Sequence, residues 1–449
     1  MENSKIIDFD NLNNLLSNKL FVAFCTYLML ISYFYNLSIF NYAATGNNEL
    51  RLYDITGVLL IYAVISNRYL LITVIFNFPF FKNLFYFLIW TTITLSFTFI
   101  YSLAIGNTVW GIQSTLYLFH FWSFFITAVF VFILIQDLKF LKNIVVVTLI
   151  AAIITFLIVI FQNFQVIPYL WSEEYKTSYN NFLSGTLGPN KIVLGMTCLF
   201  VFIFAIGLLN EKRVKINAIL LVTTISISLI TLILSGSRTT YVGLITFTVY
   251  YFFRDFSKFT ISIFMLSIVF LIISFLNSEI FIKLTDVYEY RVENKIKNKN
   301  ALKEARVDLL YDDLGSGRKE LSKMYFLFLR DHAYIIPFGS GFNNRLVIGE
   351  SSAHNIYLSL INETGLVGLF LYLRWFISLL KLKLYHFKQF EVAFHGLIIA
   401  MLVTLFFGEH IYVYRTSFGL TGLFLFITVI FASPLHHIRN QKPNEENEK

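Results

Sequence analysis

Charged residues make up only 14% of the 449 residues of this chain, and cysteine occurs only twice. Hydrophobic residues account for 57%, and 51 phenylalanines and 26 tyrosines help to raise the aromatic fraction to 18%. Such a composition lies well outside the averages of soluble proteins, so we predict a polytopic membrane protein. Cys25 and Cys198 both fall in apolar runs, which argues against a disulfide or metal framework.

Several signatures of other protein classes are also missing. No charged presequence with a small-residue cleavage site precedes Leu20, so we expect the first apolar segment to be a retained helix rather than a signal peptide. The sequence contains neither a His-Glu-x-x-His metal motif nor a phosphate-binding P-loop. We therefore expect no metal and no other cofactor, and the energy for a reaction should come from the substrate itself.

The apolar runs can be compared with the thickness of a membrane. A hydrocarbon core about 30 Å thick needs roughly 20 apolar residues per helix, which predicts about twelve spans. The second run contains Arg68, so that helix could instead end near Asn67 and continue as an interfacial segment. The approximate limits of the spans are residues 20–40, 54–76, 84–105, 114–136, 143–166, 188–209, 216–235, 238–253, 259–276, 355–380, 391–408 and 417–433.

Positive charges predict the orientation, because short loops rich in lysine and arginine stay in the cytoplasm. Alternate connections carry these residues, which places both termini in the cytoplasm and the other set of connections outside. This topology also explains the net charge of +8, so no nucleic-acid partner is needed. The basic connections contain Lys82, Lys139, Lys142, Lys212, Arg213, Lys215, Arg254, Lys258, Lys381, Lys383, Lys388, Arg439 and Lys442.

The predicted fold is therefore all-α, a transmembrane helix bundle with one large outward loop. Residues 1–276 hold nine spans, residues 277–354 form the loop, residues 355–433 hold three spans, and residues 434–449 form a cytoplasmic tail. A hydrophilic loop of this length favours a functional role over a simple connector, although balanced charges are also typical of a solvated surface.

The large loop divides into parts of different character. Residues 291–310 lack glycine and proline, which indicates a helix, and residues 319–332 are predicted to form an amphipathic helix. The glycine-rich segment from Gly339 to Asn344 is expected to be a flexible loop that returns the chain to the membrane.

Two arginines follow short turns of glycine and serine. Arg238 comes after Ser-Gly-Ser, which ends at Ser237, and it begins an apolar run at the outward side, where the N-terminus of a helix favours an anion. Arg318 ends Gly-Ser-Gly-Arg on the large loop, where glycines allow the backbone to approach a ligand closely. Each has a plainer interpretation, since Arg238 could be an interfacial anchor and Arg318 a solvated surface residue.

His354 lies where the large loop meets the next membrane helix, directly before Asn355. An imidazole with a reference pKa of about 6.5 can accept a proton from a hydroxyl group near neutral pH. An isolated histidine at a helix start would more often satisfy local hydrogen bonds only. Its position at the membrane surface makes His354 the best candidate for a general base.

Six further residues are candidates to line the same cleft: Ser237, Asn355, Glu363, Glu409, His410 and Arg415. Glu363 lies nine residues beyond His354, roughly 13 Å along a helix, and a carboxyl group at this depth needs a partner or a wet cavity. A structural pair with an arginine explains Glu363 equally well. Glu409, His410 and Arg415 gather on the last outward loop, where a solvated turn is an equally good explanation.

The order of these motifs resembles the bacterial O-antigen polymerase and O-antigen ligase superfamily. The resemblance rests on the Ser-Gly-Ser-Arg-Thr-Thr turn, the large loop with Gly-Ser-Gly-Arg and Gly-Ser-Gly-Phe, and Ala-His-Asn-Ile-Tyr-Leu followed by Asn-Glu-Thr-Gly-Leu-Val-Gly. It covers mainly residues 188–380. The resemblance implies an integral-membrane glycosyltransferase of GT-C-like, all-helical architecture in the bacterial inner membrane, independent of metal, with undecaprenyl-pyrophosphate-linked glycans as donors at the periplasmic face.

Carried over to this sequence, the resemblance implies that Arg238 and Arg318 hold the donor pyrophosphate and that His354 activates the acceptor hydroxyl. A polymerase would move the growing glycan onto another lipid-linked repeat unit, whereas a ligase would move it onto lipid A-core. The richness in Phe, Ile and Asn favours the polymerase, and a flippase and a chain-length regulator would be its partners. A transporter of lipid-linked glycans and a sensing or scaffold protein are the alternatives from other classes.

The topology can be tested by labelling single cysteines with a reagent that does not cross membranes. We expect a cysteine near Asn300 to be labelled from outside, and one between Lys212 and Lys215 only after the membrane is made permeable, because basic loops are retained in the cytoplasm. Labelling near Asn300 from the cytoplasm alone would contradict both the topology and an outward site.

Overall fold

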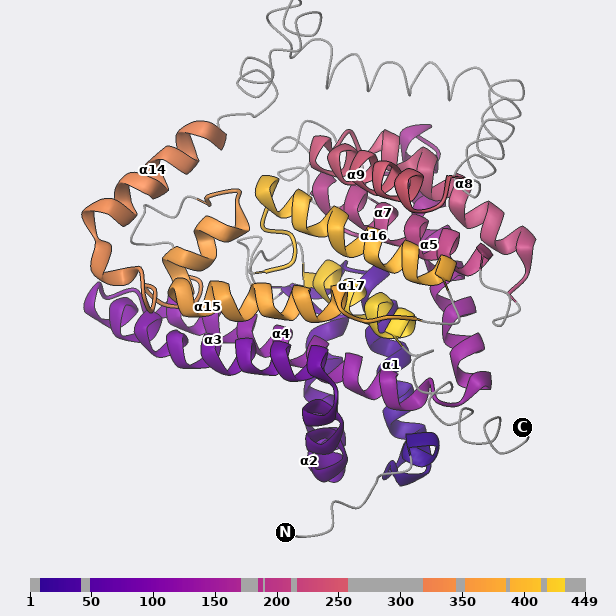
Figure 1. Cartoon of the computed structure of the whole chain (residues 1–449), viewed down its shortest axis with the longest axis horizontal. Helices are drawn as coiled ribbons and strands as arrows, with labels where there is room; N and C mark the ends of the chain where they lie inside the picture. Colours follow the sequence, from indigo (N-terminus) through magenta and orange to yellow (C-terminus); the bar gives the residue numbers. More distant parts are fainter. Residues whose placement is uncertain are drawn as a thin grey trace, which may run out of the picture.

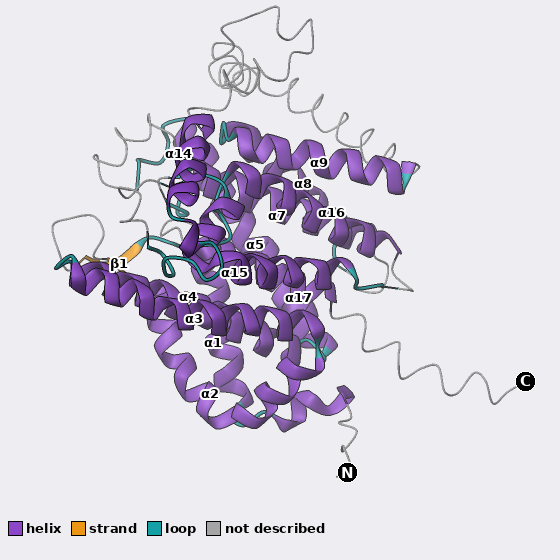
Figure 2. Cartoon of the chain, turned by 60° about the vertical axis from the view of Figure 1, so that its left-hand side comes forward, coloured by secondary structure: helices purple, strands orange, loops and turns teal. Residues whose placement is uncertain are grey.

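A computed structural model of the chain describes residues 9–41, 49–170, 185–188, 190–210, 216–256, 318–344, 352–384, 388–412 and 418–432. These residues form an all-α bundle, shown in Figure 1, with one small antiparallel pair of strands, β1 (Ser38–Asn41) and β2 (Glu49–Arg51). Figure 2 marks the position of β1 at the edge of the bundle. The predicted fold class is confirmed. The α-helices of this part of the chain are α1 (Lys19–Phe34), α2 (Leu52–Asn77), α3 (Pro79–Ala104), α4 (Thr108–Leu134), α5 (Leu138–Asn163), α7 (Lys191–Asn210), α8 (Ala218–Leu234), α9 (Arg238–Arg254), α14 (Arg318–Asp331), α15 (Ile356–Leu380), α16 (Lys388–Thr404) and α17 (Phe418–Ala432).

The described segments contain 7 helices that are long and apolar enough to cross a membrane, which supports a multi-pass membrane protein. Every predicted span except one coincides with a helix, and the exception, residues 259–276, lies outside the described residues together with the predicted helix 291–310. The amphipathic helix predicted over residues 319–332 is α14. It lies at one end of the bundle beside the start of α15 (Figure 1).

Helix α2 bends at Asn67, the residue near which the sequence allowed the helix to end. Asn67 has non-helical dihedrals, and its amide accepts a hydrogen bond from the N–H of Ser17 (2.8 Å) and donates to the carbonyl of Ser17 (3.2 Å). The helix continues to Asn77 beyond this kink. Arg68 is exposed, with its guanidinium carbon 4.9 Å from the centre of the Tyr69 ring, as expected of an interfacial anchor.

The centre of the bundle is formed by helices that are apolar all round. α7 buries the side chains from Val193 to Leu208, and the second half of α4 is buried from Phe124 to Leu134 except at Ile126. A helix buried on every side belongs in the middle of a bundle. Around it α7 packs on α8, α3 on α15, α9 on α16 and α4 on α17.

Helix α15 is broken at Gly365, whose φ of 70° and ψ of −174° lie outside the helical region. The break removes intrahelical partners from the three carbonyl groups that precede it. The indole N–H of Trp90 donates to the carbonyl of Thr364 (2.8 Å), and the N–H groups of Ser340 and Gly341 donate to those of Asn362 (2.7 Å) and Glu363 (2.9 Å). A segment from the large loop, together with Trp90 of α3, therefore replaces the missing helical bonds.

The segment from Gly339 to Asn344 is packed into the bundle, so the expectation of a flexible loop is wrong. Phe342, Asn343 and Asn344 are all buried. Thr98 of α3 donates to the carbonyl of Phe342 (2.6 Å), and Trp110 of α4 donates to the carbonyl of Asn343 (2.9 Å). The glycines serve close backbone approach here rather than mobility.

The docked loop can be tested by adding a single methyl group. Gly339 has a φ of 82°, and a Cβ there would clash with the carbonyl oxygen of Glu363, whereas Gly106 has a φ of 72° with open space around it. Both Gly→Ala changes bear the cost of a left-handed residue, about 1–2 kcal/mol. We expect Gly339→Ala to lower the thermal unfolding temperature clearly more than Gly106→Ala. Equal losses would contradict the docking.

Candidate functional site

The predicted turn before Arg238 forms the start of α9. Gly236 has a φ of 59°, and Ser237 is the N-cap, with its hydroxyl oxygen accepting from the N–H (3.4 Å) and the hydroxyl (2.9 Å) of Thr240. Ser237 is buried and is used for capping, as expected of a serine at this position. Arg238 follows as the first helical residue and is half-buried.

The start of α9 is connected to the turn that follows α16. The hydroxyl of Thr239 donates to the carbonyl of Phe407 (3.4 Å), the last residue of the short 3-10 helix η5 (Leu405–Phe407). Glu409 follows two residues later and is buried. Arg238 and Glu409, 171 residues apart in sequence, thus lie on adjoining segments of one site.

Glu409 organises the segment that carries His354. The hydroxyl of Ser352 donates to Oε2 of Glu409 (2.7 Å), and the hydroxyl of Ser359, on α15, donates to Oε1. The oxygen of Ser352 also accepts the backbone N–H of His354 (3.3 Å). The buried carboxyl group is therefore linked to the candidate base through one serine.

His354 itself is exposed and has a φ of 49°, in the left-handed region. Few residues other than glycine adopt this region, and such strain tends to be found at functional sites. Asn355 then caps α15, because its Oδ1 accepts from the N–H groups of Tyr357 (3.0 Å) and Leu358 (3.3 Å). Asn355 fixes the start of the helix, and the imidazole is left accessible beside it.

Two of the predicted cleft residues hold the structure together. The ring of His410 is buried, and its Nε2 lies 3.1 Å from the hydroxyl of Thr404 at the end of α16. Oε2 of Glu363 accepts the N–H of Asn343 (2.7 Å), so this carboxyl group fastens the docked loop at the break in α15. Both contacts support structural roles for these residues, and the burial of His410 contradicts the alternative of a solvated turn.

The helix that begins at Arg318 covers the same region. Tyr325 of α14 is buried in a cluster with Ala353 and Leu358, on either side of His354. Arg318 lies seven residues before Tyr325, about 10 Å along the helix axis. The structure therefore brings the helix of Arg318 onto the loop of His354, whereas Arg415 lies outside the described residues.

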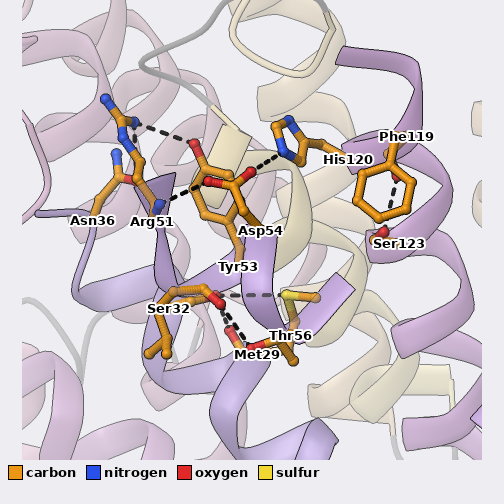
Figure 3. Close-up of polar contacts among 11 residues, drawn as sticks. Met29, Ser32, Asn36, Arg51, Tyr53, Asp54, Thr56, Phe119, His120 and Ser123 are labelled. Atoms are coloured by element: carbon orange, nitrogen blue, oxygen red, sulfur yellow. Dashed lines mark hydrogen bonds and ion pairs between the residues drawn. The ribbon is translucent and has the colours of Figure 1, made fainter. Parts of the chain in front are cut away.

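Sequence reasoning missed a polar cluster among the N-terminal helices, drawn in Figure 3. Oδ1 of Asp54 pairs with Nε2 of His120 in α4, and Oδ2 accepts the N–H of Arg51 (2.7 Å). The guanidinium of Arg51 donates to Asn36 (3.1 Å) and to the hydroxyl of Tyr53 (3.3 Å). A histidine within an apolar run is rare, so His120 was the signal in the sequence that could have indicated this pair.

The cluster connects the segment that follows α1 with the end of β2, the start of α2 and the middle of α4. The side chain of Asn36 accepts a hydrogen bond from the guanidinium of Arg51. It also donates one to the carbonyl of Leu187 (3.1 Å), in the segment before α7. Buried ionic groups of this kind are retained only when they are paired and hydrogen-bonded. The arrangement supports a structural role for Arg51, Asp54 and His120. All three lie far in sequence from the motifs that predicted a catalytic or binding site.

A comparison with protein families finds a match within the chain. Residues 219–373 match the family model described as O-antigen ligase. The match covers about a third of the 449 residues. The predicted resemblance to the O-antigen polymerase and ligase superfamily is confirmed by this match. Members of the matched family are glycosyltransferase-like enzymes, and the family implies lipid-linked glycans as substrates in general. The sequence has no significant match among curated proteins.

The matched segment includes Arg238, Arg318, His354 and Glu363 but ends before Glu409 and His410. The link from Glu409 to His354 was therefore visible only in the structure. The candidate site therefore includes residues that lie outside the segment matched by the family model.

The role of Glu409 can be tested by removing its carboxyl group. Glu409→Ala leaves the hydroxyls of Ser352 and Ser359 without their acceptor, which costs roughly 1–3 kcal/mol for the buried hydroxyl of Ser359 and less for the partly buried one of Ser352. We expect a lower unfolding temperature and a loss of glycan transfer. Glu409→Gln keeps one acceptor oxygen and should be milder, and Ser359→Ala should be milder still, because Ser352 then retains its contact. Wild-type stability of Glu409→Ala would contradict the network.

Proposed function

We propose that this protein polymerises undecaprenyl-pyrophosphate-linked oligosaccharide repeat units into O-antigen or a related surface polysaccharide. The reaction takes place at the periplasmic face of the bacterial inner membrane, with both termini of the chain in the cytoplasm. One observation supports this most strongly: hydrogen bonds from Thr239 to Phe407 and from Ser352 to Glu409 bring the turn of Arg238 and the loop of His354 into one site.

In this proposal Arg238 and Arg318 bind the pyrophosphate of the donor. Each arginine begins a helix, α9 and α14 respectively. A guanidinium group keeps its charge at any physiological pH and can form two parallel hydrogen bonds to a phosphate. When the bond from the anomeric carbon to the phosphate oxygen breaks, negative charge develops on the leaving diphosphate. Two arginines would stabilise this charge more in the transition state than in the ground state.

His354 accepts the proton of the attacking sugar hydroxyl. The exposed imidazole sits on a backbone held by Ser352 and Asn355, so its position is fixed while its ring remains accessible. The hydroxyl oxygen forms the new glycosidic bond as the diphosphate leaves from the opposite face. A single displacement of this kind inverts the configuration at the anomeric carbon, and it requires neither a metal nor a nucleotide.

The second candidate is an O-antigen ligase that transfers the glycan to lipid A-core. The matched family model carries this description, which is the observation that favours it. The same arginines and histidine would serve both reactions, because the two differ only in the acceptor. Supplying purified protein with lipid-linked repeat units alone separates the candidates, since only a polymerase makes longer glycans without lipid A-core.

The catalytic role of His354 is tested with purified protein in lipid and a defined undecaprenyl-pyrophosphate glycan. We expect His354→Ala to lower the rate by about 10² to 10⁴, the usual loss for a positioned general base. His354→Gln should not restore it, because an amide can accept a hydrogen bond but cannot take the proton. Exposure of the side chain predicts unchanged stability for both variants. A wild-type rate for His354→Ala would reject this assignment.

The pyrophosphate site is tested in the same assay. Arg238→Lys retains the charge but removes the planar fork, so we expect only partial activity, and we expect less still from Arg238→Ala and Arg318→Ala. Arg68→Ala is the matched control, since this exposed arginine contacts Tyr69 on α2. Unchanged polymer length and yield for both alanine variants at equal protein level would rule out the clamp. Loss of wild-type activity with EDTA would rule out the metal-free mechanism.

A further inference from the structure

One buried amide has no hydrogen-bond partner in the part of the chain that the structure describes. Both Oδ1 and Nδ2 of Asn362 are unpaired there, although the residue is only 1% exposed. Oδ1 of Asn344, also 1% exposed, is in the same condition. Unsatisfied buried polar atoms are rare in native proteins, and an ordered water molecule or a ligand usually explains them.

The two amides lie on either side of Ser340. Ser340 donates to the carbonyl of Asn362 from its N–H (2.7 Å) and from its hydroxyl (2.9 Å), while Nδ2 of Asn344 donates to the carbonyl of Ser340 (2.8 Å). These contacts hold both residues that carry the unpaired amide atoms against Ser340, so that Asn362, Ser340 and Asn344 form one cluster. Two chain segments contribute to the cluster: the first half of the broken helix α15 and the loop that docks on it.

The cluster shares the first half of α15 with the candidate site. Asn362 is three residues beyond Ser359, so the two side chains share one face of α15, and Ser359 binds Glu409. Asn362 lies six residues, about 9 Å along the helix axis, beyond Ile356, where α15 begins two residues after His354. A polar face of α15 therefore continues from the candidate base to the break in the helix.

The chemistry of the unpaired atoms selects the ligand. Two amide oxygens accept hydrogen bonds and one amide nitrogen donates them. A cation would be served by the oxygens but repelled by the N–H groups, and an anion would meet the opposite problem. A neutral hydroxyl group both donates and accepts, so it satisfies both kinds of atom.

We propose that Asn362 and Asn344 form a subsite for a neutral hydroxyl group. The hydroxyl belongs either to a water molecule or to a sugar of the lipid-linked glycan, at a unit other than the one that reacts at His354. The sugar as the source rests on the proposed function. The subsite itself does not, because it follows from the unpaired buried amides.

The first experiment asks whether the subsite is occupied. We expect an experimental density map of the substrate-free protein in lipid, at a resolution that shows buried water, to contain a non-protein peak within about 3 Å of the Asn362 amide. Such a peak establishes water as an occupant. This measurement does not depend on any enzymatic activity.

The second experiment asks whether a sugar hydroxyl binds there. Asn362→Ala should raise KM for the lipid-linked glycan about two- to tenfold with little change in kcat, the effect expected when one hydrogen bond is lost. Asn362→Ser, which keeps a small group that donates and accepts, should give a smaller rise. Ser228→Ala is the control, because this buried hydroxyl on α8 is also unpaired within the described residues. It belongs to a different helix from the cluster, since α8 packs on α5 and α7.

The outcomes are distinct. A raised KM supports the sugar as ligand, and a density peak with unchanged KM supports water alone. No peak together with unchanged KM in both Asn362 variants overturns the subsite. If the wild-type protein makes no product from the lipid-linked glycan, the proposed function fails, and the density map still decides the subsite.

Discussion

Inside a bilayer every polar backbone group must find its partner within the protein, because lipid offers none. The break at Gly365 of α15 shows how this constraint acts on the protein. Three freed carbonyl groups are satisfied by Trp90, Ser340 and Gly341, so the helix can be interrupted only because a loop docks against it. The segment that precedes α15 and the membrane helices consequently form one unit.

The position of the candidate site follows from this docking. The first half of α15 begins beside His354 and carries Ser359, and its far end is held by the loop before the break. α14 packs on the same half-helix through Tyr325, and the turn after η5 meets it through Glu409. Segments that are far apart in the chain are thus arranged around a helix of about two and a half turns.

Composition and hydropathy predicted the membrane helices of the described residues, because the length of an apolar run is set by the thickness of a membrane. The predicted helix limits differ from the observed ones by up to six residues. Motif order also predicted one region for Arg238 and His354, and hydrogen bonds through Thr239 and Ser352 connect both of their segments to the turn around Glu409. Packing partners were beyond reach: nothing near Glu409 in the sequence distinguishes a carboxyl group held by two serines from one in a solvated turn. The docked loop was mistaken for a flexible one, since its glycines serve close approach and carry no signal of what they approach.

The kink of α2 has a consequence for how freely the N-terminal part of such a chain can change. The amide of Asn67 pairs with the peptide N–H and carbonyl of Ser17, not with its side chain. Every amino acid except proline supplies these two groups. This contact can therefore form with any residue other than proline at position 17, so substitutions there leave the shape of the bundle unchanged.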